Sequence, residues 1–146
     1  MAAATSNKAT WENMSSKLLL MGGVASVVLG EPRSKMQSGT VAIIPESGRV
    51  DETVLNAARE IHVVTLRRYE NALAEPPDQI EQRLDQWRAN IVRDICGDFD
   101  LGGTVAYALP AELAWQYGYQ TFENTQYRLL DITVAYRVDD RTTFAQ

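Results

Sequence analysis

The residues that could carry out chemistry are few and lie far apart in the sequence. The chain of 146 residues contains a single histidine, His62, and a single cysteine, Cys96. A histidine metal site normally needs further ligands near by, and no basic partner flanks the cysteine to lower its pKa. We therefore expect His62 to be a hydrogen-bonded strand residue and Cys96 to be an inert core thiol.

Two carboxylates on alternate residues, Asp98 and Asp100, could coordinate a divalent cation if a turn brought their oxygens together. They lie directly after a predicted helix, where aspartates commonly cap turns, and the pattern favours this role. Gly102 and Gly103 lack the further glycines and the following helix of a nucleotide-binding loop, so they indicate a turn. We predict no catalytic residue, metal or cofactor; a small metal-dependent hydrolase that uses Asp98 and Asp100 is the enzymatic alternative.

The composition is that of one folded domain. Hydrophobic residues make up 45% of the chain and charged residues 23%, which argues against bulk disorder. We expect residues 1–9 to be a tail and residues 10–146 to form a single domain. The net charge of −5 disfavours nucleic-acid binding as the main task, and the apolar stretch 18–30 has only 13 residues, too few to cross a membrane.

Two segments have the spacing of amphipathic helices. Apolar residues recur every three or four positions through residues 10–21. The same spacing is found again in residues 75–97, where Gly97 is expected to end the helix. The apolar positions of the second segment are Ile80, Leu84, Trp87, Ile91 and Ile95. Residues 24–29 are compatible with either helix or strand, because they follow a helical pattern but are rich in β-branched side chains.

The remaining pattern predicts strands at residues 40–45, 58–72, 104–118 and 126–139, with the charged second half of 58–72 reaching solvent. The polar segment 46–57 is expected to be an exposed excursion between strands. The order of elements indicates an α+β fold, in which a single antiparallel or mixed sheet of about four main strands carries both helices on one face.

Aromatic residues gather around the last two predicted strands in larger number than a two-layer fold can bury, so some of them should contact a partner. Pro110 marks residues 104–118 as an edge strand, because proline lacks the N–H that an interior strand needs. The basic pair Arg67 and Arg68 could face an acidic partner, although the sequence favours a role in keeping an edge strand soluble. The candidate contact residues are Arg67, Arg68, Tyr69, Pro110, Trp115, Tyr117, Tyr119 and Phe122.

The arrangement as a whole resembles the tail terminator proteins of long-tailed bacteriophages. The resemblance covers about residues 10–140 and lies in the order of elements. It includes the turn with "GEP", the strand ending "AIIP", the long strand "REIHVVTLRRYEN", one amphipathic helix, and the closing segments "LGGTVAYALP" and "YRLLDITVAYRVDD". It implies a non-enzymatic virion protein of the phage neck, assembled in the host cytoplasm.

The resemblance also implies partners. A tail terminator forms a ring, typically a hexamer, on the end of the tail tube, stops tail polymerisation and offers a docking surface to the head connector. Genome DNA would pass through its lumen without specific binding, and no membrane is involved. The contact regions would be the edge hairpin, residues 46–57 and the charged half of residues 58–72. The alternative within the same class is a head–tail adaptor, expected to be mostly helical, or a stopper, expected to be mostly β.

Overall fold

The computed structural model describes residues 6–54, 57–97, 107–109 and 112–140. Within these ranges the chain forms two helices and six strands. Their order is α1 (Lys8–Leu19), β1 (Ser26–Leu29), β2 (Thr40–Val54), β3 (Ala57–Asn71), α2 (Pro77–Gly97), β4 (Tyr107–Ala108), β5 (Ala114–Phe122) and β6 (Thr125–Asp140).

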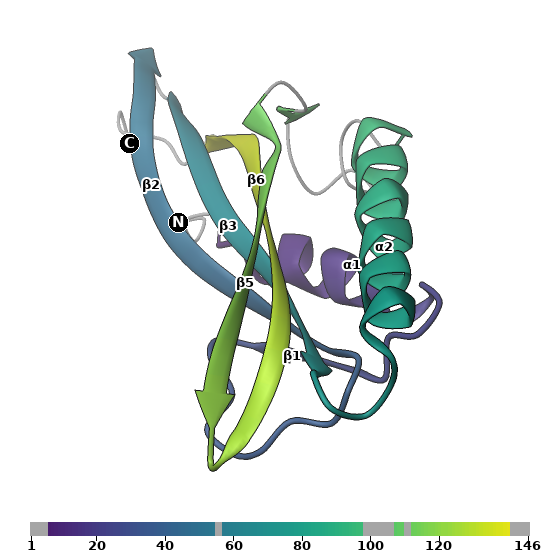
Figure 1. The fold of residues 1–146 in the computed structure, drawn as a ribbon. Helices are drawn as coiled ribbons and strands as arrows, with labels where there is room; N and C mark the ends of the chain where they lie inside the picture. The colour runs from purple at the N-terminus through teal and green to yellow at the C-terminus, as the bar shows by residue number, and fades with distance from the viewer. Residues whose placement is uncertain (1–5, 55–56, 98–106, 110–111, 141–146) are drawn as a thin grey trace.

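All the strands belong to one mixed sheet with the order β1-β2-β3-β6-β4, and β5 also pairs with β6 (Figure 1). β1 is parallel to β2, whereas the other neighbouring strands are antiparallel. Met14 and Leu18 of α1 join the same buried cluster as Leu84 and Trp87 of α2, so both helices cover one face of the sheet. The predicted α+β fold, with one sheet and both helices on one face, is confirmed.

A second, smaller cluster lies on the opposite face of the sheet. It consists of Met36, Ala42, Tyr69, Tyr127 and Leu129. The Tyr127 hydroxyl donates a hydrogen bond of 2.8 Å to the Met36 carbonyl, which fastens the segment after β1 over this face. The sheet is thus covered on its second face by connecting chain instead of a helix.

The prediction that residues 46–57 form an excursion between strands is wrong for residues 46–54, although residues 46–50 are exposed as expected. β2 continues through them to Val54 and pairs with β3 along almost its whole length. Its register shifts between Pro45 and Ser47 and again between Val50 and Glu52. Each bulge adds a residue to one strand, so the alternation of apolar and polar side chains is interrupted and the sequence pattern no longer indicates a strand.

The other predicted boundaries move by a few residues. Residues 26–29 of the ambiguous segment are the strand β1. The strand expected at 104–118 is divided, within the described residues, into the short β4 and the longer β5. β5 joins β6 through Glu123 and Asn124, whose φ values of 50° and 63° are those of a two-residue hairpin turn. Most of the segment expected to connect the two strands is therefore part of them.

His62 is hydrogen-bonded within the fold, as expected. Its Nδ1 lies 3.2 Å from Asn7 Nδ2, and its Nε2 lies 2.8 Å from Glu60 Oε1. The Asn7 amide can only donate to Nδ1, so the proton of the neutral ring lies on Nε2 and is donated to Glu60. His62 stacks on Tyr136, whose hydroxyl donates to Asn7 Oδ1 at 3.0 Å, and these contacts hold the start of α1 against β3 and β6.

Replacing Tyr136 by phenylalanine should lower the free energy of unfolding by about 1 kcal/mol at neutral pH, because Asn7 Oδ1 loses its donor. Burial raises the pKa of Tyr136 to about 12 from the ordinary value of 10.0. The folded chain therefore keeps the phenolic proton at a pH where the unfolded chain loses it, and stability falls as the pH rises between these two values. Urea unfolding at pH 8 and at several pH values above 9.5 measures both effects.

The Tyr136→Phe variant should lose less stability across the alkaline range than the wild type, because it has no phenol to titrate there. Tyr119→Phe is the matched control at pH 8, since Tyr119 is 62% exposed and its hydroxyl makes no hydrogen bond in the described part of the chain. Equal alkaline slopes for the wild type and Tyr136→Phe would contradict the assigned origin of the pH dependence.

Candidate interface

The strand β5 lies at one edge of the sheet. Among the described residues it pairs with β6 alone, and most of its side chains are exposed or half-buried. The expectation of an edge strand is thus confirmed for residues 114–118 and extends to Phe122. Pro110, on which that expectation rested, lies outside the described residues.

Three aromatic side chains, Trp115, Tyr117 and Tyr119, stand at alternate positions of β5 and form what we call the aromatic ladder. The guanidinium of Arg128 lies 5.2 Å from the centre of the Tyr117 ring and 4.6 Å from that of Tyr119. Arg88 of α2 lies 4.9 Å from the ring of Trp115. Each cation is attracted by the electron-rich ring face, so these contacts favour the observed orientations of the rings.

Carboxylates position both arginines of the ladder. Arg128 Nε and Nη2 donate to the two carboxylate oxygens of Glu81 at 2.7 and 3.3 Å, and Nη1 donates to the Gly118 carbonyl at 3.2 Å. The hydrogen bonds to Glu81 raise the pKa of Arg128 further above its ordinary value. Arg88 Nε donates to Asp85 at 3.0 Å. The aromatic ladder of β5 is therefore supported by arginines from β6 and α2.

The four aromatic residues predicted on this hairpin have two different environments. Trp115 is 45% exposed and Tyr119 is 62% exposed. Tyr117 contacts the core beneath the helices, and Phe122 contacts the smaller core on the opposite face. Trp115 and Tyr119 thus present large, oriented rings to solvent, which is the chemistry of interface anchor residues.

The three predicted contact residues of β3 do not share this surface. β3 lies between β2 and β6, so it is an interior strand and needs no charge to protect an edge. Arg68 is fully buried and Tyr69 is 2% exposed, which corrects their assignment to a contact surface and the expectation that this half of the strand reaches solvent. Arg67 is half-buried and binds both oxygens of Asp131 on β6 at 2.7 and 3.0 Å.

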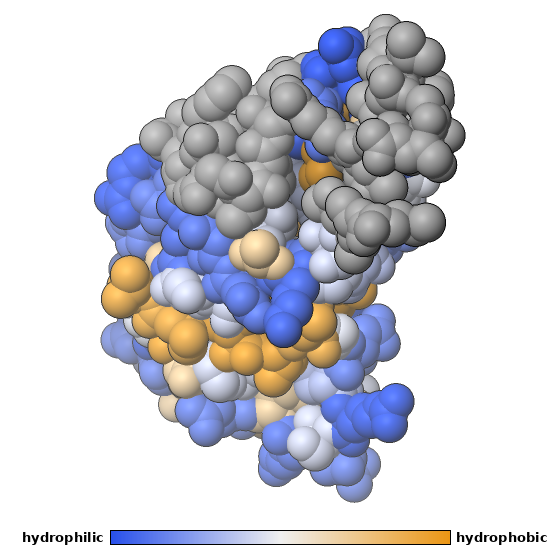
Figure 2. Space-filling view, turned by 180° about the vertical axis from the view of Figure 1, so that it is seen from behind, coloured by the Kyte–Doolittle hydropathy of each residue, from blue (hydrophilic) through white to orange (hydrophobic). Residues whose placement is uncertain are grey.

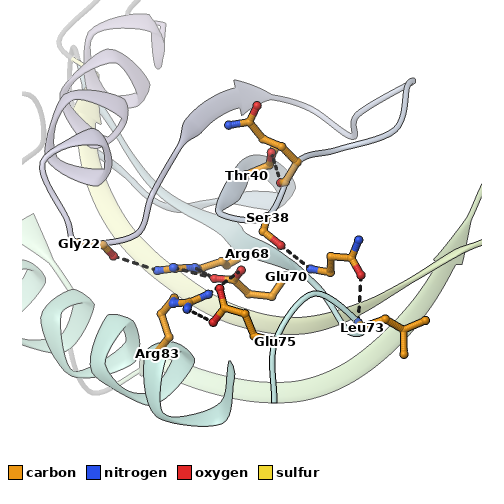
Figure 3. Close-up of polar contacts among 10 residues, drawn as sticks. Gly22, Ser38, Thr40, Arg68, Glu70, Leu73, Glu75 and Arg83 are labelled. Carbon is orange, nitrogen blue, oxygen red and sulfur yellow. Dashed lines mark hydrogen bonds and ion pairs between the residues drawn. The ribbon is translucent and has the colours of Figure 1, made fainter. Parts of the chain in front are cut away.

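Arg68 belongs to a buried ion network that the sequence did not predict (Figure 3). Its Nε and Nη2 donate to Glu70 Oε1 at 3.0 and 2.8 Å. The other oxygen of Glu70 accepts from Arg83 of α2 at 3.4 Å, and Arg83 also binds Glu75. Burial lowers the pKa of Arg68, and the neighbouring Glu70 charge opposes that effect. One feature of the sequence could have indicated this contact: Arg68 and Glu70 are two residues apart, which places their side chains on one face of a strand.

The network also fixes the connection between α1 and β1. Arg68 Nη1 donates to the Gly22 carbonyl at 3.4 Å. Gly23 has a φ of +79°, and a Cβ atom on it would lie 2.6 Å from Arg68 Nη2. This glycine therefore provides both the backbone conformation and the space that the guanidinium needs. The network has a structural role in joining the sheet, α2 and this connection.

Several sequence-predicted positions lie outside the described residues. They are Asp98, Asp100, Gly102 and Gly103, and the side chain of Cys96 lies outside them as well. Within the part of the chain that is described, no group of three or more histidine, cysteine, aspartate and glutamate side chains is placed to hold a metal ion. Neither described helix has the length and apolar character needed to span a membrane. Comparisons with protein-family models and with curated proteins gave no match.

Proposed function

We propose that this chain is a structural protein of the neck of a long-tailed phage, which forms a ring on the end of the tail tube, ends tail polymerisation and offers a docking surface to the head connector. The observation that carries the proposal is the aromatic ladder on a sheet edge. Trp115 and Tyr119 are exposed there, and each ring packs against an arginine that favours its orientation. Exposed and oriented aromatic rings favour binding of another protein, because little side-chain freedom is lost on contact.

The fold supports the same proposal. Helix, strands, a long strand, a single amphipathic helix and a closing hairpin follow one another as in the sequence pattern that resembles tail terminators. An adaptor of this size is expected to be mostly helical and a stopper mostly β. A fold with two helices on a six-stranded sheet fits each of these classes less well than it fits a tail terminator. The proposed partners are other copies of the chain, the tail tube protein and the head connector, and the proposed location is the virion.

The net charge also suits a channel for DNA. At −5, the chain lacks the broad positive charge that would hold phosphates, so genome DNA could pass through the ring without adhering. In this proposal the mechanism consists of contacts alone: neighbouring copies close a ring by symmetry, and the ring covers the growing end of the tube.

The purified chain should form rings of about six copies, and Trp115→Ala should weaken their assembly more than tenfold, by the loss of an interface anchor. Light scattering over a range of protein concentrations measures the assembly. Leu73→Ala is the matched control, because Leu73 is 86% exposed but lies in the connection between β3 and α2.

A second measurement tests the role in the tail. Tail tubes assembled in the presence of the chain should be shorter, with the chain bound at their ends, as seen by electron microscopy. A chain that stays monomeric at high concentration and leaves tube length and tube ends unchanged would contradict the proposed function.

A further inference from the structure

We propose that the ring is built by pairing the β5 edge of one copy with the β1 edge of the next, with Trp115 and Tyr119 entering a groove between α1 and β1 of that neighbour. This contact rests on the proposed function, since it describes how copies of the chain meet. It names the two surfaces involved and predicts that they are different.

The first argument is the position of the two edges. β1 borders one end of the sheet and pairs only with β2 in the described ranges, while β5 lies beyond β6 at the other end. Each edge leaves backbone N–H and C=O groups free to pair with another strand. Because the two edges are different surfaces, contacts between them are head-to-tail, and a repeated head-to-tail contact closes a ring when the rotation fits.

The second argument is a groove beside β1. It has a volume of about 420 Å³, and it lies between one side of α1 and the residues of β1 and β2. Its lining is mostly apolar and includes Trp11 of α1, Val27, Val28 and Leu29 of β1, and Ile43 of β2. Leu29 is 61% exposed at its rim. Seen from behind, the molecule carries a band of apolar side chains across its middle, bordered by polar residues (Figure 2). A groove of this kind accepts large apolar or aromatic side chains.

The third argument is that the groove and the aromatic ladder lie on the same face of the sheet. Val27 contacts the core beneath the helices, whereas Val28 contacts the core on the opposite face. Tyr117, at the centre of the ladder, contacts the same helix-side core as Val27. Side chains keep to one face when a sheet is extended by another strand, so Trp115 and Tyr119 would be presented to the groove side of the neighbouring copy.

The fourth argument is charge. Arg33 and Lys35 are exposed in the segment after β1, whereas Glu112 and Glu123 are exposed at the two ends of β5. None of these four side chains has an ion-pair partner among the described residues. Within the sheet β1 and β5 run in opposite directions, so the pairing that keeps the helix faces of both copies on one side is antiparallel. This direction brings the Glu112 end of β5 toward the basic segment that follows β1. The charges of the two edges are therefore complementary, as expected of surfaces that bind each other.

Two variants test the contact, each with one edge impaired. Leu29→Glu places a charge at the rim of the groove and leaves β5 intact. The double variant Trp115→Ala/Tyr119→Ala removes the exposed aromatic rings and leaves the groove intact. Each variant alone should lose the ring and run as a monomer in light scattering, while circular dichroism remains that of the wild type. An equimolar mixture should form a dimer of one copy of each, because only one functional pair of edges remains.

The control for surface charge is Leu73→Glu, since Leu73 is 86% exposed in the connection between β3 and α2 and belongs to neither edge strand; it should keep the wild-type ring. Rings of wild-type mass from both edge variants, or monomeric variants that give no dimer on mixing, would overturn the edge contact and leave the proposed function standing. A wild type that neither self-associates nor binds tube ends contradicts the proposed function itself.

Discussion

Replacing Glu70 by alanine is expected to lower the free energy of unfolding by about 3–5 kcal/mol, because it leaves a buried guanidinium without its counter-charge. Glu70 is 1% exposed and accepts hydrogen bonds from Arg68, which is fully buried, and from Arg83. The remaining hydrogen-bond acceptor of Arg68 in the described residues is the neutral Gly22 carbonyl, at 3.4 Å. Urea unfolding followed by circular dichroism measures the loss.

Two further variants separate the cost of an unpaired charge from the value of the ion pair itself. Glu81→Ala removes a glutamate whose side chain is 44% exposed and bound to Arg128, and it should cost no more than about 1 kcal/mol. The double variant Arg68→Met/Glu70→Met should be more stable than Glu70→Ala, because no lone charge is then buried between these positions. A double variant as unstable as Glu70→Ala would show that the pair contributes stability by itself.

Replacing Trp87 by alanine is expected to cost about 3–5 kcal/mol as well, through loss of buried apolar surface and the cavity left behind. Trp87 is 1% exposed and is the largest of the fully buried side chains in the described structure. Its ring also lies under Arg68, whose guanidinium carbon is 5.7 Å from the ring centre, so the cavity would open beside the ion network. Thermal and urea unfolding measure the change.

The matched control for Trp87 is the exposed tryptophan of the aromatic ladder. Trp115→Ala should cost about 1 kcal/mol or less, since it loses mainly the contact with Arg88. Trp87→Phe should lose less stability than Trp87→Ala, because the indole Nε1 makes no hydrogen bond in the described chain and a phenyl ring refills most of the space. The two tryptophans thus separate folding from assembly, and similar stabilities for Trp87→Ala and Trp115→Ala would contradict this division.

The helices and the fold class could be predicted from the sequence because their signals are local. Ile80, Leu84, Trp87 and Ile91 of α2 recur with the period of a helix, and all four are buried in the same core. The edge position of β5 was also predictable, but its bounds were not, because β5 pairs with β6 through residues 118–122, where the sequence pattern indicated a connection. Excess aromatic residues on this hairpin correctly indicated exposed rings at Trp115 and Tyr119.

The contact residues of β3 could not be predicted correctly, since their environment is set by strands distant in the sequence. A charged run such as Arg67 to Glu70 is typical of an exposed strand, and only pairing with β2 and β6 makes β3 an interior strand. Arg83, which follows β3 in the sequence, folds back to bind the buried Glu70, and Glu75 binds Arg83 in turn. The groove beside β1 likewise depends on where α1 lies.

The sequence by itself determined where the chain forms helices, that it folds as α+β, and that the closing hairpin carries more aromatic rings than a core can bury. These properties follow from side-chain periodicity and composition, which act over a few residues. The tertiary structure alone decided which strands are interior and which are edges, that β2 runs through its bulges to Val54, and that Arg68 and Glu70 are buried. Those properties depend on strand register and on contacts across the sheet, and no local pattern encodes them.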